Sequence, residues 1–458
     1  MPFQNISPDP KDEYFADGLT EELISTMAKI SGLRVIARTS VMGYKVGQKK
    51  IDEIARELRV GTILEGSVRK AGDKLRITAQ LIDAESSDHL WSESYDREMK
   101  DVFMIQSEIS QTVAEALKVK LLPTEKERVE KKPTNNVKAY ELFLRGLETA
   151  PWVTSLGEWT EENIERSREY FERAVELDPN FALAYAHLES CYMEAYTYKR
   201  FDERAPKAEA AARKAMELDP NLAESHFALA DTKWHSYDFD GWEKEMKLTI
   251  ELKPNYAGGH FGLGLHHLLV GRFGDAEMEM RRARELDPTA PLTKYFFRVL
   301  LAVSRQFDRA VEETAEEIKL HDRPDLHDFL AGIYLARGDY EKALIESKKA
   351  VAASGPEVRP RCISTLACIY AKTGRKEDAT KILKELEELS RQSATVYDFL
   401  ADIYFCLGDY DEAFGVLERA YDEHSEYLPF SLINPLDDKL RFDPRFIVLR
   451  KKVGLENS

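Results

Sequence analysis

The hydrophobic pattern of this chain repeats at a fixed distance between residues 215 and 288. The phrase Ala215-Met-Glu-Leu-Asp-Pro220 returns as Thr249-Ile-Glu-Leu-Lys-Pro254 and as Ala283-Arg-Glu-Leu-Asp-Pro288, so the three prolines lie 34 residues apart. From Ala257 to Leu269 the apolar residues recur at helical spacing, and after a glycine-containing turn residues 275–286 do so again. Each copy therefore predicts a hairpin of two amphipathic helices, which must stack on further copies to bury its apolar faces.

These positions resemble the tetratricopeptide repeat family. The period of 34, the large-small pair Leu263-Gly264, the alanines Ala276 and Ala283 and the closing proline all match its pattern. The resemblance implies a right-handed superhelix, with a concave groove lined by the first helix of each repeat.

About eight repeats fit between residues 137 and 427. Small residues let two helices approach closely, so we expect Gly264, Ala331, Ala367 and Ala401 to lie buried where helices cross. The fifth repeat is degenerate, because Arg305 stands at the turn position where its neighbour has a glycine.

The first 121 residues follow a different pattern, in which alternating and helical segments take turns. The predicted helices span residues 20–30, 51–58 and 102–121, and the predicted strands span residues 33–37, 60–68, 75–81 and 89–95. Thr20, after Asp17-Gly18-Leu19, is the candidate N-cap of the first helix. This pattern indicates a compact α/β domain.

Four stretches of this domain resemble the TolB-like amino-terminal domain: Pro2-Phe3-Gln4-Asn5-Ile6-Ser7, Asp17-Gly18-Leu19-Thr20-Glu21-Glu22, Leu64-Glu65-Gly66-Ser67-Val68-Arg69 and Leu90-Trp91-Ser92-Glu93. In bacterial signalling proteins, that domain often stands between tetratricopeptide repeats and an N-terminal effector. Such effectors include class III nucleotide cyclases, winged-helix DNA-binding domains and serine/threonine kinases.

In that family the first motif ends a hydrophobic strand, whereas here Met1 stands where this strand should already be under way. We therefore expect either a shortened first strand or further residues upstream. We also expect residues 1–5 to pair as a strand within the sheet.

The fold class that the sequence predicts is α+β, with a small α/β domain followed by an all-α tetratricopeptide superhelix and a C-terminal cap. The predicted divisions are 1–121 for the TolB-like domain, 122–136 for a linker, 137–427 for the solenoid and 428–458 for the capping segment. The linker assignment rests on Pro123 and a charge-rich run. The cap rests on the amphipathic pattern of Phe446, Val448, Leu449 and Val453.

Charge and composition narrow the function. The net charge is −17, and most of it lies after residue 121. An acidic superhelix repels phosphate, which argues against nucleic-acid binding. No apolar run in the sequence is long enough for a membrane span, no secretory signal is recognisable, and the four cysteines lack metal or redox spacing. We therefore expect a cytoplasmic protein without membrane attachment.

No group of residues indicates catalysis. The chain carries neither a phosphate-cradling glycine loop nor a kinase His-Arg-Asp signature. His226, His260, His266 and His267 lie close together in the sequence and invite a metal assignment, but the first two fall six residues after a motif proline. That regularity favours a packing position. We expect no enzyme activity, no cofactor and no metal.

The candidate functional feature is an extra apolar stripe on the first helix of three consecutive repeats. By resemblance to the family, positions seven, eleven and fourteen after the preceding proline line the concave groove. The predicted partner-binding residues are Phe227, Asp231, Trp234, Phe261, Leu265, Leu268, Tyr295 and Val299. Two alternatives stay open, namely that aromatic residues are common at these positions in any case, or that the chain's own tail fills the groove.

These positions also indicate the kind of partner. They lack the lysine and asparagine that the family's clamp for acidic C-termini requires, so a chaperone adaptor of that kind is disfavoured. A protein or peptide with apolar anchors and basic flanks fits better.

The sequence thus favours a non-catalytic scaffold for protein–protein interaction. One alternative is the regulatory C-terminal part of a nucleotide cyclase or kinase whose catalytic domain lies upstream. Another is a DNA-binding regulator that has lost its winged helix. The partner and the pathway stay open.

Overall fold

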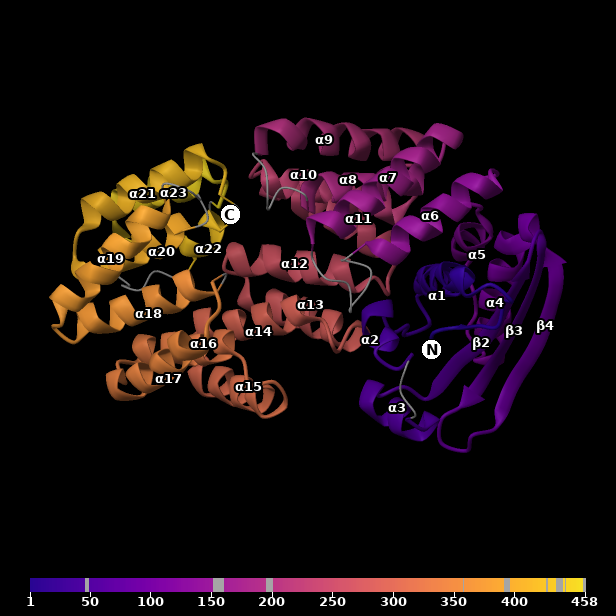
Figure 1. The fold of residues 1–458 in the computed structure, drawn as a ribbon, viewed down its shortest axis with the longest axis horizontal. Coiled ribbons are helices and arrows are strands. Elements are labelled where there is room, and N and C mark those ends of the chain that lie inside the picture. The colour runs from indigo at the N-terminus through magenta and orange to yellow at the C-terminus, as the bar shows by residue number, and fades with distance from the viewer. Residues whose placement is uncertain are drawn as a thin grey trace. The chain divides into compact units, whose positions relative to one another are not determined.

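The computed structural model describes residues 1–45, 49–150, 160–194, 201–356, 358–390, 396–425, 427–433, 440 and 442–455 (Figure 1). The N-terminal part comprises β1 (Gln4–Asn5), α1 (Glu13–Ala28), α2 (Arg38–Met42), α3 (Ile51–Leu58), β2 (Thr62–Ala71), β3 (Lys74–Asp83), β4 (His89–Glu98), α4 (Val102–Ala116) and α5 (Pro123–Glu130).

Helices make up the rest of the described chain. They are α6 (Val137–Thr149), α7 (Glu161–Leu177), α8 (Ala182–Glu194), α9 (Phe201–Leu218), α10 (Ala223–His235), α11 (Phe239–Leu252), α12 (Ala257–Leu269), α13 (Phe273–Leu286), α14 (Pro291–Val303), α15 (Phe307–Leu320), α16 (Pro324–Arg337), α17 (Tyr340–Ala353), α18 (Arg359–Lys372), α19 (Lys376–Ser390), α20 (Tyr397–Leu407), α21 (Tyr410–Asp422), α22 (Leu428–Ser431) and α23 (Pro444–Lys452). The fold class is α+β, as the sequence predicts, and every strand in the described ranges ends by Glu98.

The chain folds into two compact units. The first comprises residues 1–234, 240–263 and 279–293, and the second comprises residues 235–239, 264–278 and 294–458. Helices α12 and α13 contribute residues to both.

A four-stranded sheet with the order β1-β2-β3-β4 forms one layer of the first unit. β1 runs parallel to β2 and the other neighbours are antiparallel. Alternate residues of β3, from Leu75 to Leu81, are buried in the same core as residues of α1 and α4. Both helices lie on one side of the sheet (Figure 1). On the opposite face Arg76 forms an exposed ion pair with Asp96 at 2.7 Å. The domain is therefore two-layered, with one polar sheet face.

The expected pairing of the first residues is confirmed for β1. Gln4 aligns with Ser67 of β2, and the amino group of Met1 donates a hydrogen bond to the carbonyl of Leu64 at 2.6 Å. The amide of Phe3 donates to the hydroxyl of Thr20 at 2.9 Å. The strand is short, and it is anchored to both β2 and α1.

Helix α1 is buried on both sides. One side packs on β1 and α4, and the other packs on α6, the first helix of the repeats. Gly18 lets α1 and α6 approach so closely that a Cβ at this position would lie 2.7 Å from Cδ2 of Leu144. A single hydrophobic core consequently runs from Phe3 of the sheet domain to Phe181 between the repeat helices α7 and α8.

Three local predictions for this region are wrong. Thr20 is not an N-cap, because α1 begins at Glu13 and the Thr20 hydroxyl donates to the carbonyl of Ala16 at 2.8 Å. Residues 33–37 form no strand, because the amide of Ala37 donates to the carbonyl of Leu286 in the repeats at 2.8 Å rather than to the sheet. The helix predicted to reach residue 121 ends at Ala116.

The expected linker, residues 122–136, contains helix α5. Val129 of this helix is buried in the shared core, and Glu125 accepts hydrogen bonds from the backbone and side chain of Ser31, at 2.9 and 2.6 Å. The segment is thus packed on the α/β domain rather than extended between two bodies.

Helices α6 to α21 follow one another as eight consecutive pairs, in agreement with the predicted repeats. The period also appears in the backbone, because Tyr237, Gly271, Arg305, Gly338 and Gly374 all have a positive φ at the turn between the two helices of their repeats. Arg305 therefore adopts the left-handed conformation that glycine adopts in the neighbouring turns.

The small residues expected at helix crossings are all buried. Ala331, Ala367 and Ala401 are almost fully buried in α16, α18 and α20, and Gly264 is buried in α12. The prediction of their burial is confirmed.

A histidine joins the two helices of several repeats. Nδ1 of His226 lies 2.6 Å from a carboxylate oxygen of Glu245, and its Nε2 lies 2.9 Å from the carbonyl of Pro220. His260 repeats this arrangement with Glu279 at 2.7 Å and the Pro254 carbonyl at 3.0 Å. The predicted packing role of His226 and His260 is confirmed.

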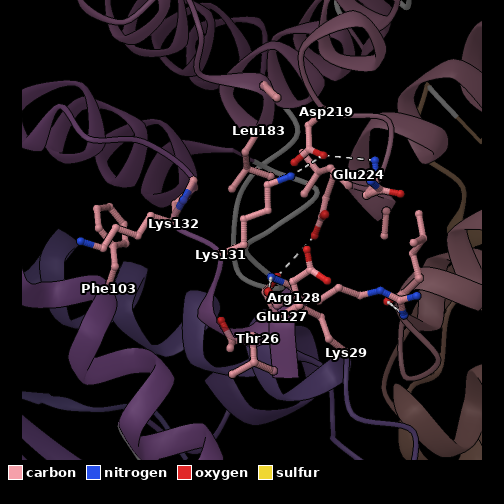
Figure 2. Close-up of a pocket in the computed structure, with 18 of the residues that line it drawn as sticks. Thr26, Lys29, Phe103, Glu127, Arg128, Lys131, Lys132, Leu183, Asp219 and Glu224 are labelled. Atoms are coloured by element: carbon pink, nitrogen blue, oxygen red, sulfur yellow. Dashed lines mark hydrogen bonds and ion pairs between the residues drawn. The ribbon is translucent and has the colours of Figure 1, made fainter. Parts of the chain in front are cut away.

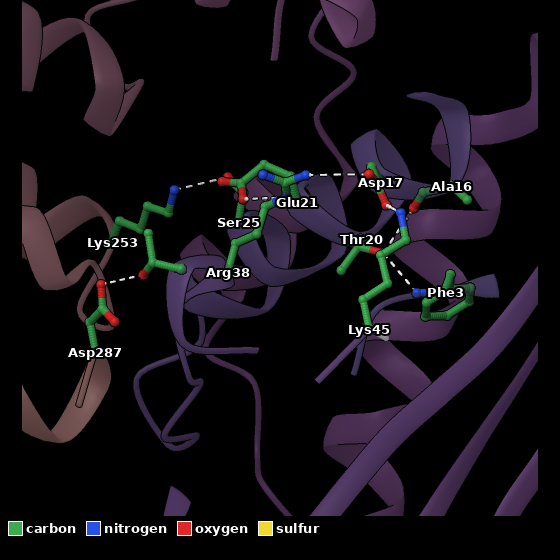
Figure 3. Close-up of polar contacts among 11 residues, drawn as sticks. Phe3, Ala16, Asp17, Thr20, Glu21, Ser25, Arg38, Lys45, Lys253 and Asp287 are labelled. Carbon is green, nitrogen blue, oxygen red and sulfur yellow. Dashed lines mark hydrogen bonds and ion pairs between the residues drawn. The ribbon is translucent and has the colours of Figure 1, made fainter. Parts of the chain in front are cut away.

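Two loops of the repeats hold the α/β domain within the first unit. Asn255 donates to the carbonyl of Ile30 at 2.9 Å, and Lys253 donates to the hydroxyl of Ser25 at 2.9 Å. Asp287 accepts hydrogen bonds from the hydroxyls of Thr39 and Ser40. Figure 3 shows Lys253 and Asp287 beside the part of the α/β domain that carries Ser25 and Arg38. The residues that end the repeat motif are thus also docking residues.

The C-terminal helix α23 packs on α21 of the last repeat. Phe446 and Leu449 are buried, while Val448 is exposed. The amphipathic face is therefore narrower than the sequence pattern indicates.

We expect the substitution Gly18→Ala to lower the free energy of unfolding by about 1–3 kcal/mol, because the added methyl overlaps Leu144. The matched control is Gly332→Ala in α16, where an added Cβ meets nothing within 4 Å and alanine should be neutral or stabilising by about 0.5–1 kcal/mol. Thermal and urea denaturation measure both. Equal effects of the two substitutions would contradict the close approach of α1 to α6.

We expect His226→Ala to cost about 2–4 kcal/mol, because it leaves Glu245 buried without its ring partner. His321 is exposed, so His321→Ala should change stability by less than about 0.5 kcal/mol. The same denaturation measurements test this pair, and a harmless His226→Ala would show that the histidine is not a structural link.

Candidate partner-binding site

Four of the predicted groove residues belong to the first unit, and all four are partly exposed. The ring of Phe227 on α10 meets the ring of Tyr256 edge-on, with the centroids 5.1 Å apart. Trp234, one helical turn past Asp231, lies 4.8 Å from the ring of the buried Trp242. Phe261 stands at the equivalent position of the next repeat, on α12. These side chains are held by neighbours while part of their surface stays accessible.

The other four residues belong to the second unit and differ in exposure. Tyr295 and Val299 on α14 are partly exposed. Leu265 and Leu268 on α12 are buried, so neither offers the accessible surface that a residue lining an open groove needs. Every residue from 262 to 269 is buried, because this part of α12 carries apolar or small residues nearly all round.

Tyr295 lies within an aromatic and charged cluster. Its ring centroid is 6.1 Å from that of Phe329 on α16, and the guanidinium of Arg361 on α18 lies 5.8 Å from its ring. Nε of Arg361 donates to Asp328 at 3.0 Å. Burial of the phenol raises the pKa of Tyr295 above its usual value. The cluster holds Tyr295 in one orientation at the first helices of three successive repeats.

Arg298, one residue before Val299, is a feature that sequence reasoning missed. It is 3% exposed, and it forms no hydrogen bond or ion pair within the described ranges of the chain. Burial lowers the pKa of its guanidinium. An arginine inside the apolar run Phe296-Phe297-Arg298-Val299-Leu300 was the signal that could have revealed it.

The last repeat presents acidic groups on its first helix. Asp398 accepts a hydrogen bond from the hydroxyl of Ser431 at 2.9 Å. Burial, with a further contribution from the charge of Asp398, raises the pKa of Asp402 to about 7. A cation placed beside Asp402 would favour its ionised form, so this position suits a basic group.

None of the helices that the structure describes combines the length and the apolar character needed to cross a lipid bilayer.

Two segments match the tetratricopeptide repeat family, namely residues 158–181 and 364–427. The chain is also similar to the putative adenylate cyclase 3 of Rhizobium meliloti (strain 1021), with 42% identity over 188 residues. The match covers 41% of this chain and 31% of that protein, so the chain spans about a third of its relative's length.

Solved structures with helical repeats show weaker similarity. A tetratricopeptide repeat protein from Parabacteroides merdae ATCC 43184 is 12% identical, with a TM-score of 0.44 over 58% of this chain and 99% of that chain. Yeast Tom70 is 18% identical, with a TM-score of 0.43 over 78% of this chain and 82% of that chain. Both scores are too low to establish a shared overall arrangement.

The family matches and the eight helix pairs lead to the same conclusion. The chain contains tetratricopeptide repeats, a type of repeat that serves as a protein-interaction scaffold and is generally non-catalytic.

Proposed function

We propose that this chain is a non-catalytic, cytoplasmic scaffold that binds a peptide or protein along the first helices of its repeats. The observation that carries the proposal is an aromatic pair in the first unit, Phe227 and Phe261, which stand at the same position of successive repeats and are both partly exposed. In the sequence the same position recurs 34 residues later as Tyr295, which is also partly exposed. Aromatic residues with accessible surface are the commonest anchors of protein interfaces. Trp234 on α10 and Val299 on α14 are also partly exposed and apolar, whereas Leu265 and Leu268 are buried.

The partner carries apolar anchors and basic flanks. Asp231 lies between Phe227 and Trp234 on α10, and Asp402 stands at the same repeat position of α20. The chain as a whole carries a net charge of −17. Charge of one sign over a binding surface steers partners of the opposite sign and disfavours nucleic acid.

A second candidate function rests on the similarity to the putative adenylate cyclase. The shared 188 residues cover only 31% of that protein. The TolB-like resemblance of residues 1–121 supports the same interpretation, in which an α/β domain and repeats regulate an effector. On this candidate the chain is the regulatory part of a signalling protein. The coding sequence upstream of Met1 tests it, since an effector domain in the same reading frame supports it and an unrelated gene there contradicts it.

The scaffold proposal predicts a specific loss of peptide binding. Peptides selected from a random display library against the intact chain should carry apolar residues flanked by lysine or arginine. Measured by fluorescence anisotropy, the affinity for such a peptide should be about tenfold lower, or lower still, in the double variant Phe227→Ala/Phe261→Ala, as expected for hot-spot residues.

The matched control is Tyr340→Ala, which removes an exposed aromatic residue at the start of α17, a second helix of its repeat. This variant should bind like the parent chain. Unchanged binding by a folded Phe227→Ala/Phe261→Ala variant would show that the binding site lies elsewhere than at the aromatic pair.

A further inference from the structure

A pocket of about 330 Å³ lies within the first unit, at the junction of the α/β domain and the repeats (Figure 2). One wall comes from α1, α4 and α5, and the other comes from the first residues of α8 and α10 and the loops before them. This volume falls at the lower end of the range for small-molecule sites, about 300–1,000 Å³. Both signs of charge line it.

The acidic groups of the pocket are only partly satisfied. Glu22 on α1 is 7% exposed, and within the described part of the chain its carboxylate makes no hydrogen bond, while the charge of Lys29 attracts it. Glu224 on α10 accepts a hydrogen bond from Lys253 through Oε1 at 2.7 Å, while its buried Oε2 has no hydrogen-bond partner among the described residues. Burial of the carboxyl group raises the pKa of Glu22 to about 7. A buried carboxylate with open acceptor positions calls for a hydrogen-bond donor.

Cationic groups line the same pocket. Within the residues that the structure describes, the ammonium of Lys29 makes one hydrogen bond, to the carbonyl of Arg128 at 3.3 Å. Lys132 is exposed and makes no ion pair or hydrogen bond within the described ranges, whereas Lys131 pairs with Asp219 at 2.7 Å. Figure 2 shows Lys29, Lys131 and Lys132 around the space that Glu224 also borders. These donors are suited to a carboxylate.

We propose that this pocket binds a small zwitterion of the amino-acid class, with its ammonium group at Glu22 and Glu224 and its carboxylate at Lys29 and Lys132. A simple anion would place its charge near two carboxylates. A simple cation would leave the positive charges of the lysines without an anionic partner. A ligand with both groups places its ammonium beside the carboxylates of Glu22 and Glu224 and its carboxylate beside the lysines, and it is small enough for the volume.

The ligand would also bridge the α/β domain and the repeats. Glu22 and Lys29 belong to the α/β domain, whereas Glu224 belongs to the repeats. A molecule held by both therefore strengthens their contact and stabilises the first unit by mass action. This site differs from the aromatic pair, since neither Phe227 nor Phe261 lines the pocket.

The test uses the full chain and the twenty common L-amino acids, each followed by isothermal titration calorimetry and by thermal denaturation. At least one amino acid should bind and raise the melting temperature. Propionate and n-propylamine, which carry only one of the two charged groups, should bind about tenfold more weakly or not at all, because each leaves one set of buried groups unpaired.

Two variants locate the site. Glu22→Gln keeps the shape of the side chain, so the variant should fold. Its affinity for the amino acid should be about tenfold lower, because one charge-assisted contact is lost. Lys132→Met, at an exposed position, should also lower the affinity for the amino acid without affecting the fold. The matched control Glu341→Gln changes an exposed carboxylate on α17 and should leave binding unchanged.

Three results would overturn the proposal. They are the absence of binding by all twenty amino acids, binding of propionate as tight as that of an amino acid, and undiminished binding by a folded Glu22→Gln variant. None of these results bears on the scaffold function, which is tested separately by peptide binding to the parent chain and to the Phe227→Ala/Phe261→Ala variant.

Discussion

The burial of helix α1 on both sides is the constraint on which the first unit depends. One side of α1 packs on the sheet and α4, and the other packs on α6 through the contact of Gly18 with Leu144. A helix in this position must bury polar side chains as well, and each needs a partner. The partner of Asp17 is Lys45, whose Nζ lies 2.5 Å from Oδ1 of Asp17. The sheet domain and the first repeats therefore form one body with a shared core.

The repeats could be predicted from the sequence because each repeat is stabilised mainly by contacts between neighbouring residues of the chain. The period fixes where the helices turn, and the positive φ of Gly271 and Arg305 shows that the turn keeps its geometry even where glycine is missing. The buried Ala331 and Ala367 follow from the same logic. A residue at a known place in a local motif has a predictable environment.

Features that depend on distant contacts could not be predicted in this way. Thr20 has the chemistry of an N-cap, but its hydroxyl is engaged by Phe3, a residue far from it in the chain. Leu265 belongs to the expected groove by its position in the repeat, yet it is buried with the rest of its helix segment. The pocket at Glu22 also escapes sequence reasoning, because its walls come from segments about 200 residues apart, brought together only by the shared core.

The places where one repeat departs from its neighbours nevertheless carry information about such distant contacts. The motif reads Asp219-Pro220 and Asp287-Pro288, but Lys253-Pro254 in between. In the structure Lys253 is buried against α1, where it donates to both Ser25 and Glu224. An aspartate there would face the carboxylate of Glu224 and could donate nothing to it. The exchange of acid for base thus marks the repeat that α1 docks on. A comparison of the repeats with one another, without any second sequence, could have located this contact.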